Sequence, residues 1–215
     1  MTRIVATSDT HFPFDNNLIP DGDVLIHAGD LMYRGDPGEW DSRLASFASL
    51  KHKTKIYVPG NHDYYPAQYR GIARSTMRRE GGGTTLNDGV DGVVKLGSTG
   101  LTMLAIPYVT GLHGWAYNVE EEWLSSWLAY HYAIPDIVIS HSPPFRIRDS
   151  AGKQSFGSTA MNRWFYALQT KPKLWICGHI HESYGTETIE GCTFANVAMC
   201  NEQYEQVNPA MVFDL

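Results

Sequence analysis

Short apolar runs rich in β-branched residues recur along the chain, and turn-forming residues such as Gly, Asp, Asn and Pro interrupt them. Runs of this length and composition are typical of buried β-strands. Glu190-Gly191 lies in the middle of one run and predicts a hairpin at that point. The strands that we expect lie at 3–8, 24–28, 55–58, 90–96, 101–106, 137–140, 174–177, 185–197 and 211–214.

Between these runs, apolar residues recur three or four positions apart, as on the buried face of an amphipathic helix. Asp36 and Pro37 predict the start of one helix, with Asp36 as the N-cap and Pro37 at the first helical position, and it should end near Leu50. The other expected helices lie at 68–79, 120–130 and 158–170. The inward face predicted for 120–130 consists of Trp123, Leu124, Trp127 and Leu128.

Strands and helices alternate at both ends of the chain, and antiparallel strands are expected between them. This order predicts an α/β (α+β) fold with two sheets face to face and helices outside. A chain of 215 residues, 43% hydrophobic and 19% charged, is typical of a globular protein. Because we see neither a linker nor a tandem repeat, we predict a single domain over 1–215.

Composition restricts the partners and the compartment that we expect. The net charge of −6 argues against an extended nucleic-acid-binding surface, although it does not exclude a small anionic substrate. The three cysteines are an odd number without C-x-x-C spacing, which favours reduced thiols and a cytoplasmic location. The N-terminus leads directly into a strand and not into a signal peptide. No apolar run approaches the ~18 residues that a membrane helix needs, so no membrane partner is expected.

Polar side chains of the metal-ligand type follow five of the expected strands. They are Asp9, His11, Asp30, Asn61, His141, His179 and His181. All of them offer nitrogen or oxygen, and none is a thiolate, so the set suits a pair of hard or borderline divalent metals with water better than a structural zinc. The metal could be manganese, iron, zinc or magnesium, because supply and geometry select among these ions more than ligand type does.

Spacing adds to this prediction. Asp9 and His11 are two residues apart, as are His179 and His181, so each pair should point to one side of an extended backbone. Asp30 stands alone after its strand, as expected of a carboxylate that bridges two cations. A water shared by two such cations would lose a proton near neutral pH and become a nucleophile.

The ordered motifs D-x-H, G-D, G-N-H-D, a lone H and G-H-x-H resemble those of the calcineurin-like metallophosphoesterase superfamily over nearly the whole chain. A closer resemblance is to small metallophosphoesterase-domain proteins and class III cyclic nucleotide phosphodiesterases. The segments that carry it are 27–30 (H-A-G-D), 114–118 (G-W-A-Y-N), 140–144 (S-H-S-P-P) with Asp149 downstream, 178–185 (G-H-I-H-E-S-Y-G) and 207–215.

The resemblance implies a four-layer αββα sandwich of two mixed β-sheets flanked by helices. It also implies direct attack by a metal-bridging hydroxide. The first metal would be held by Asp9, His11, Asp30 and His181, and the second by Asp30, Asn61, His141 and His179. His62 would protonate or hydrogen-bond the leaving oxygen, and Asp63 would orient the His62 ring.

The expected function is a phosphodiesterase for small diesters, with cyclic nucleotides as the leading substrates. A phosphomonoesterase is the alternative, although Tyr33 replaces the second acid of the G-D-x-x-D-R-G motif of protein phosphatases. A catalytically silent scaffold is disfavoured because every ligand is present. Substrate contacts are expected from Asn61, Arg34, His113, Trp115 and Arg146. An aromatic rim is expected from Tyr64, Tyr65, Tyr108, Trp115, Tyr117, Phe145 and Tyr184. The oligomeric state stays open.

Overall fold

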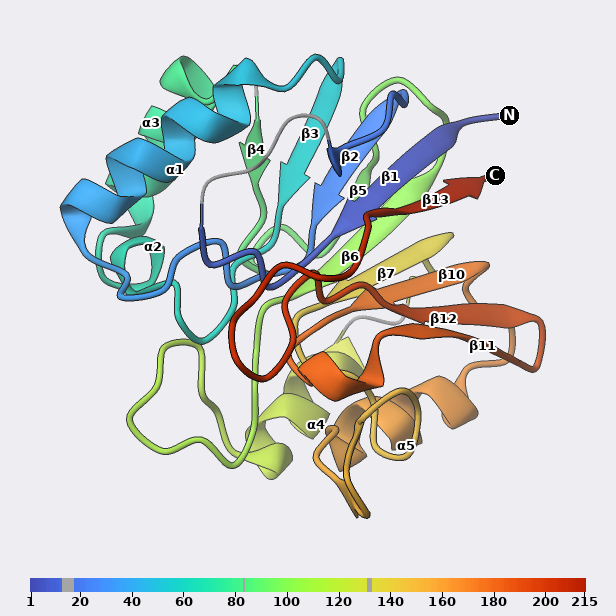
Figure 1. Ribbon diagram of the computed structural model, residues 1–215. Helices are drawn as coiled ribbons and strands as arrows, with labels where there is room; N and C mark the ends of the chain where they lie inside the picture. Colours follow the sequence, from blue (N-terminus) through green and yellow to red (C-terminus); the bar gives the residue numbers. More distant parts are fainter. Residues whose placement is uncertain (13–17, 83, 131–132) are drawn as a thin grey trace.

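The computed structural model describes residues 1–12, 18–82, 84–130 and 133–215, and in it two β-sheets lie face to face (Figure 1). The strands are β1 (Arg3–Thr7), β2 (Val24–His27), β3 (Thr54–Tyr57), β4 (Thr85–Leu86), β5 (Val93–Lys95), β6 (Thr102–Ile106), β7 (Ile137–Ser140), β8 (Ser150–Ala151), β9 (Gln154–Ser155), β10 (Leu174–Cys177), β11 (Gly185–Ile189), β12 (Cys192–Asn196) and β13 (Met211–Asp214). The helices are α1 (Pro37–Ser49), α2 (Tyr64–Gln68), α3 (Arg70–Glu80), α4 (Glu121–Tyr130), α5 (Thr159–Ala167) and a 3₁₀ turn, His181–Ser183.

Both sheets are mixed. The first has the order β13-β1-β2-β3-β4, and only its edge strand β13 runs antiparallel to its neighbour. The second has the order β11-β12-β10-β7-β6-β5, with antiparallel pairs at both edges and parallel pairs between them. Neighbouring parallel strands end at the same edge of a sheet, so the loops that follow them are brought together.

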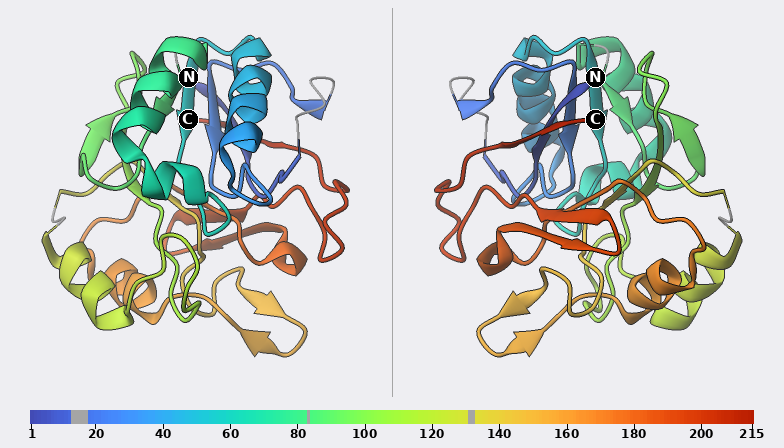
Figure 2. Two further views of the ribbon diagram at one scale, coloured as in Figure 1. Left: turned by 90° about the vertical axis from the view of Figure 1, so that its left-hand side faces the viewer. Right: turned by 90° about the vertical axis from the view of Figure 1, so that its right-hand side faces the viewer.

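Three apolar layers hold the fold together. The layer between the sheets contains buried side chains of both, such as Ile4 and Ile26 from the first and Ile139 and Ile176 from the second. Outside the first sheet, α1 and α3 contribute to a second layer, and outside the second sheet α4 and α5 contribute to a third. Figures 1 and 2 show the helices on the two outer faces of the sandwich. The predicted αββα fold is therefore confirmed.

The predicted elements differ from the observed ones in a few places. The helix expected at 68–79 is preceded by the short helix α2, and the two helices meet at Tyr69. Strands β4, β8 and β9 were not expected; each is only two residues long and carries no periodicity to detect. The Asp36 N-cap is confirmed, since its Oδ1 accepts a 2.8 Å hydrogen bond from the Glu39 backbone N–H.

The inward face of α4 is narrower than predicted. Leu124 and Leu128 are buried, but Trp123 is 46% exposed and the prediction for it is wrong. Residues four apart lie above one another on a helix, whereas Trp123 precedes Leu124 by a rotation of about 100°. Its ring instead meets the ring of Tyr108 edge-on at the border of the layer, 5.0 Å between centroids.

Two further features concern the cysteines and the possibility of a membrane-spanning helix. Cys177, Cys192 and Cys200 are free thiols, and all three are buried. Among the residues that the structure describes, no helix has both the length and the apolar character that a bilayer crossing requires.

The asymmetry of α4 is testable with a matched pair of variants. Leu128→Ala should destabilise the protein by about 2–5 kcal/mol, because it empties volume inside a closed layer. Trp123→Ala should cost less, although more atoms are removed, since the ring is half exposed. Urea unfolding of both variants measures the difference; an equal or larger loss for Trp123→Ala would contradict the observed packing.

Candidate functional site

The ligand-type side chains lie in the loops that follow five parallel strands. Asp9 and His11 follow β1, Asp30 follows β2, Asn61 follows β3, His141 follows β7, and His179 and His181 follow β10. Because the first three strands belong to one sheet and the last two to the other, the site lies where the two sheets meet at their carboxyl ends. An isolated bridge between Ser8 and Ala198 joins the sheets at this point.

The backbone reaches the site by sharp turns. Asp9, His11, Asp30 and His179 all have left-handed backbones, with φ of 50°, 53°, 56° and 68°. The expectation that each pair projects from an extended backbone is therefore wrong. Left-handed non-glycine residues cost of order 1 kcal/mol each and persist where the surrounding structure holds them. Here the Asp9 N–H donates to the Gly29 carbonyl at 2.9 Å, and the His11 N–H donates to the Asp30 carbonyl at 3.1 Å.

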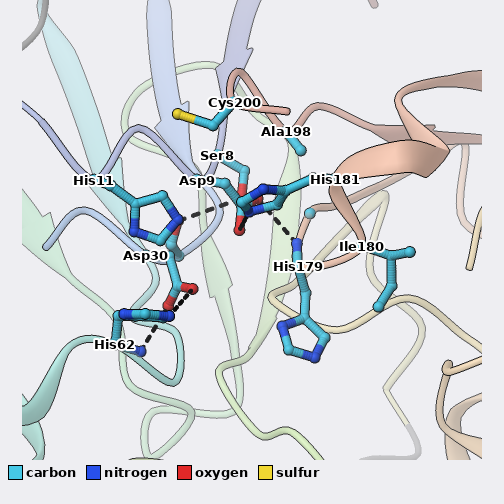
Figure 3. A network of polar contacts seen from close by, with 12 residues as sticks. Ser8, Asp9, His11, Asp30, His62, His179, Ile180, His181, Ala198 and Cys200 are labelled. Atoms are coloured by element: carbon cyan, nitrogen blue, oxygen red, sulfur yellow. Dashed lines mark hydrogen bonds and ion pairs between the residues drawn. The ribbon is translucent and has the colours of Figure 1, made fainter. Parts of the chain in front are cut away.

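These turns bring the ligand atoms into two adjacent groups. Figure 3 shows Asp9, His11, Asp30, His179 and His181 from these groups, with His62 beside Asp30. One group contains Asp9, His11 and His181, and the other contains Asp30, His141 and His179; within each, the ligand atoms lie within 4.8 Å of one another. Asn61 joins the second group, since its Oδ1 lies 2.9 Å from His141 Nε2. Asp30 also lies within 4.8 Å of His11 and His62, so its carboxylate stands between the two groups.

Three of the imidazoles are held in one tautomer. Nδ1 of His11, His141 and His181 lies 3.0, 2.9 and 2.8 Å from the backbone carbonyls of Met32, Ala28 and Asn201. A carbonyl can only accept, so each Nδ1 carries the proton and each neutral ring presents a lone pair at Nε2. Metal-bound histidines in proteins are oriented in this way.

The Nε2 lone pairs face oxygen atoms. His141 Nε2 lies 3.3 Å from Asp30 Oδ1, and His181 Nε2 lies 3.4 Å from Asp9 Oδ1. Two acceptors so close repel unless a cation or a proton lies between them. Within the described part of the chain, His11 Nε2 and Asp9 Oδ1 are buried without a hydrogen-bond partner. The donor set therefore fits divalent cations.

The pKa values of the ligand candidates also indicate that this cluster favours positive charge. Burial lowers the pKa of His141, but the neighbouring Asp30 carboxylate outweighs burial and raises that pKa to about 9. Burial likewise lowers the pKa of His181, and the neighbouring Asp9 carboxylate outweighs burial and raises that pKa to about 9. The carboxyl groups respond reciprocally: burial raises the pKa of Asp30, yet His141 holds it well below its usual range. The cluster stabilises cationic charge even though water is excluded.

Two glycines permit the close approach of these loops. A Cβ on Gly60 would lie 2.6 Å from His141 Nε2 and would strike the Asp30 carboxylate. A Cβ on Gly178 would strike Ser8 Oγ and the Asp9 carboxylate. The G-N-H and G-H-x-H motifs thus need glycine at these positions, because a candidate ligand from another loop occupies the space that a Cβ would fill.

His62 lies beside the ligand groups but is held differently. Its backbone N–H donates to Asp30 Oδ1 at 2.8 Å, and its Nδ1–H donates to the Tyr33 carbonyl at 2.7 Å. Its Nε2 lies 4.0 Å from Asp30 Oδ2. The ring stands between those of Tyr33 and Trp115, with centroid distances of 5.9 and 4.7 Å. Nε2 is therefore the ring nitrogen that the Tyr33 carbonyl leaves free.

Asp63 does not orient the His62 ring, and that prediction is wrong. The Asp63 carboxylate accepts hydrogen bonds from the backbone N–H groups of Gly60, Asp30 and Met32, at 2.7, 2.9 and 3.0 Å. Burial and the neighbouring Asp30 raise the pKa of Asp63 to about 7. Asp63 thus fixes the loops that carry Asp30 and Asn61 relative to each other.

A pocket of about 380 Å³ opens over the ligand groups. Its lining includes Asp30, Asn61, His62, His179 and His181 together with apolar and acidic side chains. The apolar part consists of Leu112, Trp115, Ala151, Phe156, Ile180 and Tyr204, and the exposed acidic residues of the lining are Glu182 and Glu202. Of the predicted substrate contacts, the structure brings Asn61 and Trp115 to this pocket.

Arg34, His113 and Arg146 are not among the residues that line it. Arg34 lies in a separate hollow beside α2, and the His113 side chain is 80% exposed next to Glu120. The Arg146 guanidinium packs over the ring of Phe145, 5.2 Å from its centroid. These three side chains therefore lie outside the pocket, and their contact with substrate stays a prediction.

The predicted aromatic rim is correct only for Trp115. The other rings of the pocket, Phe156 and Tyr204, were missed. Tyr204 has a left-handed backbone, with φ of 62°, and its ring meets those of His11 and His181 edge-on at 4.8 and 5.5 Å. None of the five motifs lies in this loop, so the motif analysis did not point to it, and the three-dimensional structure was needed to place Tyr204 at the pocket.

Comparison with known proteins agrees with the fold. The chain is 29% identical over 235 residues to human metallophosphoesterase domain-containing protein 1, covering all of this chain and 71% of that protein. It is 29% identical over 228 residues to UPF0046 protein K07C11.7 of Caenorhabditis elegans, covering 98% of this chain and 74% of that one.

Among solved structures, TT1561 of Thermus thermophilus has the same fold, with a TM-score of 0.58 and 14% identity over 91% of this chain and 88% of that one. The family model for the calcineurin-like phosphoesterases matches residues 2–183. The chain therefore belongs to the calcineurin-like phosphoesterase family.

Proposed function

We propose that this member of a metal-dependent phosphoester hydrolase family is a phosphodiesterase that acts on small diesters, with cyclic nucleotides as the leading candidates. The observation that carries the proposal is the charge of the pocket. Asp30, Glu182 and Glu202 line it, and its described lining residues include no Arg or Lys. The single-domain organisation and the cytoplasmic location predicted above belong to the same proposal.

Two divalent cations are proposed to bind in this pocket. Asp9, His11, Asp30 and His181 would hold one, and Asp30, Asn61, His141 and His179 the other. When bound, such a pair activates water and neutralises charge that develops on the phosphoryl oxygens. The chain's own contribution is to keep the Nε2 lone pairs of three imidazoles and two carboxylates aimed at one small volume.

His62 is the proposed acid for the leaving oxygen. Its Nδ1–H is committed to the Tyr33 carbonyl, so a second proton can be carried only on Nε2, which lies 4.0 Å from Asp30 Oδ2 in a residue that lines the pocket. An alkoxide is a poor leaving group, and a proton delivered at the moment of bond cleavage lowers its barrier.

The charge of a substrate decides between diester and monoester. A diester carries one negative charge, whereas a monoester near neutral pH carries close to two. Two cations would attract both, but the extra charge of a monoester needs a further cationic group, which no Arg or Lys supplies among the described lining residues. Glu182 and Glu202 add repulsion that grows with the charge of the ligand. A diester therefore suits the pocket better.

The apolar wall supports a planar alcohol or base on the ester. Trp115 and Phe156 are 41% and 49% exposed, so much of each ring remains accessible beside the ligand groups. Aromatic faces stack on nucleobases without a requirement for one particular base. A cyclic nucleotide combines a singly charged diester with such a base.

Metal binding is the first test. We expect the protein to bind two divalent metal ions per chain, which inductively coupled plasma mass spectrometry measures after dialysis against manganese. Asp30→Ala should reduce the content below one, since Asp30 stands between both groups. Asp136→Asn, at the other end of β7, is the matched control. A wild-type content of one or none would contradict the dinuclear site.

The role of His62 is tested by His62→Ala. The turnover of a 3′,5′-cyclic nucleotide, which leaves as an alkoxide, should fall roughly 10²–10⁴-fold, as for the loss of a general acid, while the metal content stays at the wild-type level. Loss of a metal from the variant would make His62 a ligand and would refute its role as the acid.

Substrate choice is tested with a panel of bis-aryl phosphate, mono-aryl phosphate, 2′,3′- and 3′,5′-cyclic nucleotides and a phosphopeptide. We expect the diesters to have the higher kcat/KM. Glu182→Gln and Glu202→Gln should raise kcat/KM for the mono-aryl phosphate more than for the bis-aryl phosphate, because they remove repulsion of its second charge. Monoester or phosphopeptide turnover more than about tenfold above every diester would favour the phosphatase alternative.

A further inference from the structure

We propose that Glu39 is a positioning residue that fixes the orientation and tautomer of His62 through the loop 33–35. The proposal rests on the role given to His62 above. Glu39 itself touches neither the pocket nor a metal ligand's side chain; it acts through backbone that it holds in place.

The first link is between His62 and Tyr33. The Tyr33 carbonyl accepts the Nδ1–H of His62 at 2.7 Å, and the Tyr33 ring stacks on the His62 ring with 25° between their planes. One residue thus supplies both a hydrogen-bond acceptor and a flat surface for the imidazole. The place of the Tyr33 backbone therefore determines where His62 Nε2 points.

The second link is between the loop and Glu39. The backbone N–H groups of Tyr33, Arg34 and Gly35 all donate to the Glu39 carboxylate, at 2.7, 2.7 and 2.8 Å. Three consecutive amides on one carboxylate define the path of a segment that lies outside any helix or strand. Hydrogen bonds to an ionised acceptor are stronger than those between neutral groups, so the loop is held firmly.

Glu39 is in turn fixed by α1. It occupies the first turn of the helix, where its backbone N–H donates to the Asp36 side chain. Its Oε1 pairs with Arg43 one turn later at 2.9 Å, and the two side chains are only 11% and 8% exposed. Arg43 also donates to the His11 carbonyl at 2.9 Å. One helix therefore supports both His62 and the backbone of a metal-ligand candidate.

Loop 33–35 packs directly on the segment that carries His62. Gly35 has a φ of 72°, and a Cβ there would lie 2.6 Å from the His62 carbonyl oxygen and 2.7 Å from the Tyr64 backbone nitrogen. The loop therefore cannot move toward this segment without displacing it. The proposed metal ligands would be held by the ions themselves, whereas His62 depends on the loop.

The test variant is Glu39→Gln, which keeps the shape of the side chain but replaces one oxygen with an NH₂ group. Since both oxygens accept backbone N–H groups, the new amide places donors against donors. Asp136→Asn is the matched control. Asp136 accepts from the Thr102 N–H and hydroxyl at 2.9 Å each and pairs with Lys173, at the amino end of β7 and away from the pocket.

The direct readout is the tautomer of His62 in the full-length, zinc-loaded protein, from two-bond proton–nitrogen NMR spectra at a pH where the ring is neutral. His62→Ala assigns the signals. We expect the wild type and Asp136→Asn to show His62 with its proton on Nδ1, and Glu39→Gln to show a mixture of tautomers. An unchanged His62 tautomer in Glu39→Gln would overturn the proposal.

Kinetics provide the second readout. Glu39→Gln should lower kcat by about 10–100-fold, as outer-shell partners of functional histidines do, for a 3′,5′-cyclic nucleotide, which leaves as an alkoxide. The loss should be smaller for bis(nitrophenyl) phosphate, whose leaving group needs no proton. Adding Glu39→Gln to His62→Ala should cause no further loss, and metal content should stay unchanged.

Equal losses on both substrates that add to the effect of His62→Ala would overturn the route through His62. A wild-type protein that hydrolyses no diester would instead contradict the proposed function. The NMR comparison would still decide whether Glu39 positions His62, so the two failures can be told apart.

Discussion

Two buried carboxylates, Asp9 and Asp30, set the main constraint on this molecule, because an ionised carboxylate removed from water requires positive charge beside it. The imidazoles of His141 and His181 lie beside them. Each Nδ1–H donates a hydrogen bond to a backbone carbonyl, and each Nε2 faces a carboxylate oxygen. Protons on these rings can satisfy the carboxylates, and so can divalent cations. The same geometry therefore explains both the raised pKa values of His141 and His181 and the fit to metals.

The arrangement of the two sheets brings these carboxylates and imidazoles together. Ligand loops leave the carboxyl ends of strands in both sheets, and hydrogen bonds connect loops of one sheet to the other. His141 Nδ1 donates to the Ala28 carbonyl, and the His179 N–H donates to Asp9 Oδ2 at 2.9 Å. The apolar layer between the sheets fixes their separation. A change in the packing of that layer would thus be felt at the ligands as a change in their mutual distances.

Local signals made much of the fold predictable, since strands such as 174–177 are apolar runs with clear ends. The features that were missed depend on contacts distant in the sequence. Asp63 was assigned to its neighbour His62, but one of its partners is the N–H of Asp30, which lies in another loop. Local preference also disfavours the left-handed turns at the ligands, and only hydrogen bonds between separate loops make them stable. Tyr204 reaches the pocket from a loop outside the five motifs. Motifs therefore identified the candidate metal ligands, whereas tertiary contacts decided which residues form the walls of the pocket.

The pocket walls and the candidate metal ligands come from different parts of the fold, and this affects which substrates the pocket can distinguish. The ligand candidates follow strands that the sheets hold in place, whereas Leu112, Trp115, Phe156 and Glu202 lie outside the named strands and helices. Metals in the centre would attract any phosphate ester, so discrimination must come from differences in how the walls receive the rest of the substrate. Acidic side chains of the lining penalise each additional negative charge while leaving the attraction of the centre intact. The loops, and not the metal ligands, are therefore where relatives with the same centre can differ in the esters they accept.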